Sequence, residues 1–239
     1  TTVLYDVNAA DADGSSANNT LTYSLKGDGS TDDAEFVAID ATTGEVTLKA
    51  SANYEAKTNY TFTVVVTDNG SPSLSSEKIV TVSVTDVDEF DVSTPVDING
   101  SSNSVQEGST AGTAFGLTAS ASDSDGTTNG VTYRLVTDST GNTALTNGPF
   151  QIDSSTGVVT VRDGSLLDYE TATSATVYVE ASSADGSTAV QNFTVQITDK
   201  NDNIPVLTSG TTGSVAENAA TTTVLFDVNA ADADGSSAN

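Results

Sequence analysis

Acidic side chains recur in short groups along the 239-residue sequence, and their type and spacing suit metal chemistry. The chain has 33 Asp and Glu against 7 Lys and Arg, a formal net charge of −26. It has neither Cys nor His, which excludes zinc sites and Ser-His or Cys-His catalysis. Carboxylate oxygens in clusters suit a hard cation, Ca²⁺ before Mg²⁺. The sequence therefore predicts a calcium-binding protein that is not an enzyme.

Four kinds of acidic motif keep the same order along the chain. A Glu ends a short strand-like segment, an Asp-x-Asp-Gly stretch follows, then an x-Tyr-Glu element, and an Asp-rich stretch closes the series. The candidate metal ligands are Glu107 and Glu217; Asp11, Asp13, Asp123, Asp125, Asp232 and Asp234; Glu55, Asp168 and Glu170; Asp86, Asp88, Glu89, Asp199, Asn201, Asp202 and Asn203; and Asp68. The alternative is a solvated, salt-adapted surface without metal, since an isolated Asp-x-Asp-Gly is usually a polar turn. Recurrence at strand ends and linkers favours metal binding.

The sequence repeats itself at two periods. Residues 1–18 recur at 222–239 with one difference, Tyr5 becoming Phe226, which gives a period of 221 residues. A weaker repeat divides this period, and its matching segments are 11–14 with 123–126, 39–44 with 152–157, and 53–55 with 168–170. We therefore predict a first domain at 1–92 that lacks its first strand, a complete domain at 93–203, and the first strands of a third domain at 204–239.

Apolar residues at every second position mark the expected strands. Because side chains alternate across a strand, each such run presents one apolar face. The runs are Tyr5-Val7-Ala9, Leu21-Tyr23-Leu25, Val46-Leu48, Tyr60-Phe62-Val64-Val66, Val80-Val82-Val84, Leu117-Ala119-Ala121, Val131-Tyr133-Leu135, Val159-Val161, Val177-Val179-Ala181 and Phe193-Val195-Ile197. About seven short strands in ~110 residues, separated by turn residues, are typical of a Greek-key, immunoglobulin-like sandwich. The expected fold class is all-β, with tandem β-sandwiches.

In this order and register, the motifs resemble those of the cadherin family. The family carries a Glu in the first strand, Asp-x-Asp after the second, a Leu-Asp-Arg-Glu element and an Asp-x-Asn-Asp-Asn linker. The closest match is Leu167-Asp168-Tyr169-Glu170 together with residues 199–205, which read DKNDNIP. The resemblance covers essentially the whole chain. Its Ser and Thr content and near-exact long period look more like giant bacterial or archaeal surface adhesins than animal cadherins.

The resemblance implies calcium at the junctions between consecutive domains. At the second junction it implies seven converging carboxylates, from Glu107, Asp168, Glu170, Asp199, Asp202, Asp232 and Asp234, with Asn201 and Asn203 in the linker. Three Ca²⁺ ions, the number found in the family, would set six positive charges against these seven negative ones. We expect flexible domains without calcium and a semi-rigid array with it.

The first junction departs from this pattern. Asn53 stands where the second repeat has Asp168, and Phe90 stands where it has Asn203. The first domain keeps Asp68, which the resemblance assigns to the junction before it. We expect fewer or weaker calcium ions at the first junction.

The partners expected from the sequence are calcium and neighbouring repeats or copies of the chain, met head to tail or homophilically. Cell-surface glycans are a further candidate. A net charge of −26 excludes nucleic acid, and without a long apolar run we expect no direct membrane insertion. The expected location is extracellular or at the cell surface, and the expected role is adhesion or aggregation. The alternative is a spacer or fibre subunit, in which a first strand around Val215 completes the first domain of a neighbouring copy.

Overall fold

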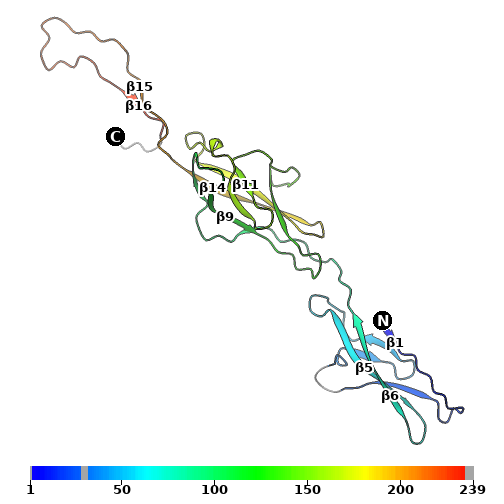
Figure 1. Cartoon of the computed structure of the whole chain (residues 1–239). Coiled ribbons are helices and arrows are strands. Elements are labelled where there is room, and N and C mark those ends of the chain that lie inside the picture. The colour runs from blue at the N-terminus through cyan, green and yellow to red at the C-terminus, as the bar shows by residue number, and fades with distance from the viewer. Residues whose placement is uncertain (1, 28–31, 235–239) are drawn as a thin grey trace. The chain divides into compact units, whose positions relative to one another are not determined.

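The computed structural model describes residues 2–27 and 32–234 and divides the chain into two units (Figure 1). Unit 1 comprises residues 1–89 and 124–127, and unit 2 comprises residues 90–123 and 128–239. Residues 235–239, which belong to the predicted third domain, lie outside the described residues. Within the described ranges, no helix is long and apolar enough to cross a membrane.

Unit 1 is a sandwich of two three-stranded sheets. One sheet has the order β1-β4-β3 and the other β2-β5-β6. The strands are β1 (Val3–Asp6), β2 (Leu21–Leu25), β3 (Val37–Ile39), β4 (Glu45–Leu48), β5 (Asn59–Asp68) and β6 (Ser75–Ser83). Inward-facing residues of both sheets form one core, centred on Phe62, Val37 and Val46, none of which has exposed surface. Every second residue of β5 faces this core, as its alternation predicts.

Unit 2 contains a sandwich of two four-stranded sheets. The sheet orders are β10-β13-β14-β8 and β11-β12-β9-β7, with β8 parallel to β14. The elements are β7 (Val96–Asp97), β8 (Ser104–Gln106), β9 (Ala114–Ser120), β10 (Thr132–Val136), β11 (Phe150–Ile152), β12 (Val158–Val161), the 3₁₀ helix η1 (Gly164–Leu166), β13 (Ser174–Ser182) and β14 (Thr188–Thr198). Leu117, Val159 and Val195 lie at the centre of its core. The all-β sandwich fold predicted from the sequence is confirmed.

The sequence predicts a first strand around Val215, and the structure has no strand there. Residues 212–216 are in no strand, and among the described residues after 203 the strands are β15 (Val206–Leu207) and β16 (Ala230–Ala231), which pair with each other. Figure 1 shows the chain between these two strands as a long loop. Val215 is 53% exposed. Similarity to the segment at residues 104–107 does not make a strand without a partner to take the backbone hydrogen bonds.

The turn between β11 and β12 requires glycine. Gly157 has φ +71°, a conformation that L side chains rarely adopt, and a Cβ there would lie 2.0 Å from the backbone oxygen of Ala119. We expect Gly157→Ala to lower the free energy of unfolding by more than about 2 kcal/mol, since both strain and a clash oppose it. Gly112→Ala separates the two effects, because Gly112 has φ +88° but no atom within 4 Å of its Cβ position. Urea denaturation measures both; equal losses would show that the clash is absent.

The same turn makes stability depend on pH. Hydrogen bonds from the Ser155 hydroxyl and from the Thr156 and Ser155 N–H groups lower the pKa of Asp153 to about 2. Because the folded pKa lies below the unfolded value of about 3.9, this stabilisation is present above pH ~4 and is lost as pH falls toward 2. We expect Asp153→Asn to flatten this part of the stability profile in urea titrations. A profile as steep as that of the wild type would contradict the assignment.

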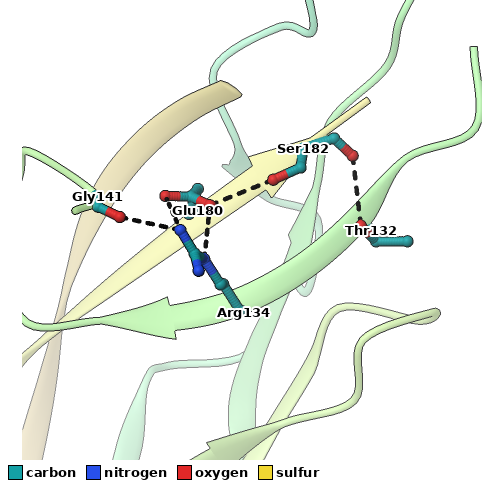
Figure 2. A network of polar contacts seen from close by, with 5 residues as sticks. All are labelled: Thr132, Arg134, Gly141, Glu180 and Ser182. Atoms are coloured by element: carbon teal, nitrogen blue, oxygen red, sulfur yellow. Dashed lines mark hydrogen bonds and ion pairs between the residues drawn. The ribbon is translucent and has the colours of Figure 1, made fainter. Parts of the chain in front are cut away.

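An ion pair on the outer face of the β10-β13 pair holds the loop after β10 (Figure 2). Arg134 donates from Nε to Glu180 Oε1 at 2.6 Å and from Nη2 to Glu180 Oε2 at 3.1 Å. The same Nη2 donates to the Gly141 carbonyl at 3.0 Å, and Ser182 Oγ donates to Glu180 at 3.2 Å. Glu180 is only 3% exposed. The hydrogen bonds and charge of Glu180 raise the pKa of Arg134. The bond from Arg134 to the Gly141 carbonyl fixes this loop on the sheet.

Candidate metal sites

Glu107 follows β8 and is held by two backbone N–H groups. Because β8 runs parallel to β14, the end of β8 lies beside the end of β14, where residue 199 begins the Asp-rich stretch. Glu107 Oε1 accepts from Lys200 N at 2.8 Å, and Oε2 accepts from Tyr169 N at 2.7 Å. The side chain is 3% exposed. Strand pairing thus brings three sequence motifs to one point.

The x-Tyr-Glu turn is anchored by apolar neighbours on its two sides. Leu167 is buried in the core, and Tyr169 packs against it. Asp168 accepts from the N–H and the hydroxyl of Thr171, both at 2.9 Å. This arrangement leaves Asp168 and Glu170 on the exposed side of the turn, where carboxylate oxygens of both lie within 4.8 Å of each other and of one from Glu107.

Asp199 and Asp234 extend this group. Carboxylate oxygens of Glu170, Asp199 and Asp234 also lie within 4.8 Å of one another. Asn203 donates from Nδ2 to Asp234 at 2.9 Å and from its backbone N at 3.1 Å, which ties the linker to the Asp-x-Asp motif. We call Glu107, Asp168, Glu170, Asp199 and Asp234 the second carboxylate cluster.

The second carboxylate cluster is electrostatically strained without a cation. Desolvation and the negative charges of Glu107, Asp199 and Asp234 raise the pKa of Glu170. Asp199 Oδ1 is buried and accepts no hydrogen bond from the described residues. By contrast, the Asn203 side-chain amide, its N–H and the Asp202 N–H outweigh burial and lower the pKa of Asp234. A bound cation would relieve the repulsion and satisfy the buried oxygen.

A similar group lies within unit 1. Carboxylate oxygens of Glu55, Asp86 and Glu89 lie within 4.8 Å of one another, and Asp125 accepts from the Glu89 backbone N at 3.3 Å. Thr127 donates its hydroxyl to Asp86 Oδ2 at 2.5 Å. We call Glu55, Asp86, Glu89 and Asp125 the first carboxylate cluster.

The first carboxylate cluster shows the same electrostatic signature. Desolvation and the charges of Glu55, Asp125 and Asp86 raise the pKa of Glu89. Asp86 Oδ1 is buried and accepts no hydrogen bond within the described part of the chain. Two repeats therefore place mutually repelling carboxylates with a buried oxygen at matching motifs.

The other predicted ligands are not members of these two clusters, although one carboxylate oxygen of Asp88 lies within 4.8 Å of one from Asp125. Asp11, Asp13 and Asp68 line a shared hollow of about 290 Å³ in unit 1, where Asp68 also accepts from the Gly70 and Leu74 N–H groups. Asp232 accepts from the Asp234 N–H at 3.2 Å. The remaining predicted ligands outside the clusters are partly or fully exposed: Asp88, Asp123, Asn201, Asp202 and Glu217. A ligand role for all of these residues stays a prediction.

The donor sets of both clusters fit calcium. They consist of carboxylate oxygens, with the Asn203 amide beside the second cluster. Ca²⁺ takes six to eight oxygens in flexible geometry, whereas Mg²⁺ demands a near-ideal octahedron. Each cluster has an excess of negative charge and one buried carboxylate oxygen that accepts no hydrogen bond from the described residues. Both features favour binding of a divalent cation. The residues present therefore fit the ion that the motifs predict.

Sequence reasoning missed the groups that hold the ligands. The Tyr169 and Lys200 N–H groups orient Glu107, and the Thr127 hydroxyl orients Asp86. A backbone N–H donor cannot be predicted from residue type, because almost every residue has one. Thr127 could not be singled out among the many Thr residues of the chain. Only the parallel pairing of β8 with β14 could have placed Lys200 beside Glu107.

The fold and the two carboxylate clusters together define a class of protein. Its members consist of tandem β-sandwich repeats in which recurring motifs bring carboxylates close together. The cadherin domain model matches residues 1–85 and 101–198. The chain therefore belongs to the cadherin family.

Curated relatives are long cadherin-repeat proteins. The chain is 32% identical to human Protocadherin Fat 1 over 196 residues and 35% identical to mouse Protocadherin Fat 4 over 208 residues. These matches cover 81% and 86% of the chain but 4% of each relative. Chimpanzee Protocadherin alpha-2 is 29% identical over 98% of the chain and 24% of its own length. The chain thus corresponds to a small part of such proteins.

Solved cadherin ectodomains share the fold. A crystal structure of mouse Cadherin-23 EC22-24 superposes with a TM-score of 0.69 at 26% identity, covering 98% of this chain and 71% of that one. Human CDH23 EC21-23 gives a TM-score of 0.66 at 29% identity, covering 90% and 74%. These neighbours confirm that the chain consists of tandem cadherin repeats.

Proposed function

We propose that the chain is part of an extracellular or cell-surface protein whose cadherin repeats bind Ca²⁺ and are stiffened by it, in the service of cell adhesion or aggregation. The observation that carries the proposal is the second carboxylate cluster. This cluster brings together carboxylates of a sandwich, of the linker that follows it and of the next Asp-x-Asp motif. It also contains the buried Asp199 Oδ1, which accepts no hydrogen bond from the described residues.

Calcium would act by joining segments that otherwise repel one another. Glu107 and Glu170 belong to the sandwich of unit 2, Asp199 begins the linker, and Asp234 follows it. Without a cation, the negative carboxylates repel one another and push these segments apart, whereas a shared cation holds the segments together. The linker then loses freedom, and consecutive repeats keep a fixed orientation.

Small-angle scattering tests the stiffening. In millimolar calcium we expect a narrow distribution of interatomic distances with a larger maximum dimension. After chelation, we expect a broader distribution and a smaller mean radius of gyration, since the repeats move independently. Magnesium at equal concentration controls for charge screening. Profiles that do not change with chelator would contradict the proposal.

Adhesion and passive spacing remain separate roles of the same repeats. Beads coated with the chain should aggregate in calcium and disperse with chelator if the repeats adhere to copies of themselves. Beads that stay dispersed in calcium, while scattering shows stiffening, assign the chain to a spacer or stalk. Protocadherin-like relatives support the adhesive role.

A fibre subunit assembled by strand donation is the second candidate. Among the described residues, β6 pairs only with β5, whereas its counterpart β14 also pairs with β8. Residues 214–217 read SVAE, similar to the SVQE of residues 104–107 that form and follow β8, and Val215 is exposed. A second copy could thus supply this segment to β6. Sedimentation tests it: assembly that Val215→Asp abolishes supports donation, and a concentration-independent monomer contradicts it.

The Ser- and Thr-rich composition and near-exact 221-residue period support a microbial surface protein as the source. The relatives compared above are animal proteins. Sequencing the complete gene in its genome tests this part of the proposal. A microbial gene that encodes further copies of the 221-residue unit would support it, and an animal gene would contradict it.

A further inference from the structure

Unit 1 contains a hollow of about 410 Å³ whose floor is aromatic. It lies between the start of β3, the end of β4 and the turn before β5, and its lining includes Phe36, Leu48, Lys49, Lys57 and Tyr60. Phe36 is 43% exposed. Its centroid lies 6.1 Å from that of Tyr60, with the rings inclined at 59°. We call this the aromatic hollow; its volume falls within the range of about 300–1,000 Å³ typical of ligand pockets.

The second repeat differs at the corresponding place. The β11-β12 hairpin repeats the register of β3-β4, and Arg162 N bonds to the Pro149 carbonyl as Lys49 N bonds to that of Phe36. After Arg162 the chain forms η1 and buries Leu167 in the core. Unit 1 has two residues fewer between β4 and its x-Tyr-Glu element. Pro149 stands at the position of Phe36, so the ring of Phe36 beside Tyr60 is a feature of the first repeat.

Two ammonium groups lie at the aromatic hollow in a chain that has only five Lys. Lys57 Nζ lies 2.8 Å from Asp33 and 5.6 Å from both ring centroids. Partial burial acts to raise the pKa of Asp33, but the Lys57 and Thr61 hydrogen bonds outweigh it and lower that pKa. Lys49 Nζ donates to the Glu35 carbonyl at 2.9 Å. An ammonium group has three donors, so within the described part of the chain two of them are left for a ligand.

These groups match one ligand chemistry. An electron-rich ring face attracts the C–H side of a pyranose, and an ammonium prefers a carboxylate, with which it forms charge-assisted hydrogen bonds. Exposed polar side chains at the rim, Glu35, Ser51 and Asn53, suit ring hydroxyls. We propose that the aromatic hollow binds one uronic acid unit of an acidic polysaccharide, with its ring on Phe36 and its carboxylate on Lys49.

The net charge of −26 does not prevent this binding. At physiological ionic strength the Debye length is about 8 Å, so charges beyond that distance are largely screened. Asp33 is neutralised by Lys57 at close range, and Lys49 carries the charge that a carboxylate meets. This site is independent of the two carboxylate clusters.

Amide chemical-shift titration of the whole chain in calcium tests the proposal with three probes. We expect sodium glucuronate to give saturable shifts at Phe36, Lys49 and Lys57 with a Kd near the millimolar range, glucose to bind at least tenfold more weakly, and benzoate to bind more weakly than glucuronate. Absence of saturable shifts with glucuronate, or preference for benzoate or glucose, would overturn it.

Matched variants locate the binding. We expect Lys49→Gln to raise the Kd for glucuronate at least tenfold and Phe36→Leu to raise it about fivefold. Lys78→Gln, at an exposed Lys of β6 outside the hollow, should leave it unchanged. Phe36→Leu keeps an apolar side chain, and dispersed amide spectra verify that each variant is folded. Wild-type affinity in both Lys49→Gln and Phe36→Leu would refute the site.

Discussion

Replacing Glu107 by Gln should lower the calcium affinity of the second carboxylate cluster at least tenfold. Glu107 is 3% exposed, and its two oxygens accept from Tyr169 N and Lys200 N. Gln keeps the shape but removes the negative charge and replaces one acceptor by an N–H₂ group facing a backbone donor. A carboxylate this deep in the site contributes both charge and orientation, so its loss affects every ion bound there.

The same substitution should destabilise the calcium-free protein by about 1–3 kcal/mol, because a buried backbone N–H loses its acceptor. Calorimetric calcium titration and urea denaturation in chelator measure the two effects separately. Glu217→Gln is the matched control, since Glu217 occupies the corresponding motif but is exposed and joins no described cluster. Unchanged affinity in Glu107→Gln, or equal losses in both variants, would contradict this role.

The first carboxylate cluster should bind calcium about tenfold more weakly than the second. At the position that Asp168 holds in the second cluster, the first repeat has the neutral Asn53, whose side-chain oxygen already accepts from Ala56 N at 2.7 Å. Phe90 stands where Asn203 lies beside the second cluster and offers no side-chain oxygen. Affinity in such sites follows the number of charged ligands and the rigidity of the site.

Two variants separate the clusters. Asp199→Asn should remove the tighter class of calcium sites, and Asp86→Asn the weaker class, whose Kd we expect within the range of about 10⁻⁴–10⁻³ M typical of extracellular modules. Calcium titrations of the wild type and both variants provide the comparison. A single class of equal sites, or loss of the tighter class in Asp86→Asn, would contradict the ranking.

Strand positions were predictable from the sequence because burial imposes alternation. The run from Tyr60 to Val66 falls within β5, and the run from Phe193 to Ile197 within β14. The motif match at Val215 did not predict a strand correctly, because no neighbouring strand among the described residues completes its backbone hydrogen bonds. Whether a segment forms a strand depends on a neighbouring strand, and the residues of the segment alone do not specify that neighbour.

The candidate ligands were predictable as types, and the cadherin resemblance implied that they converge, but the contacts that bring them together were not predictable. Glu107 and Asp199 lie 92 positions apart, and only the parallel β8-β14 pairing brings their motifs together. The ion pair between Arg134 and Glu180 was likewise not predictable from the sequence. The aromatic hollow was not predictable either, because Phe36 and Tyr60 lie 24 positions apart and only the fold brings their rings together.

A crystal structure of the chain grown in saturating calcium, with anomalous scattering to identify the ions, tests the central claim most directly. We predict Ca²⁺ in the second carboxylate cluster, held at about 2.3–2.6 Å by oxygens of Glu107, Glu170, Asp199 and Asp234. The same four side chains turned apart into solvent, with no ion among them, would contradict the account.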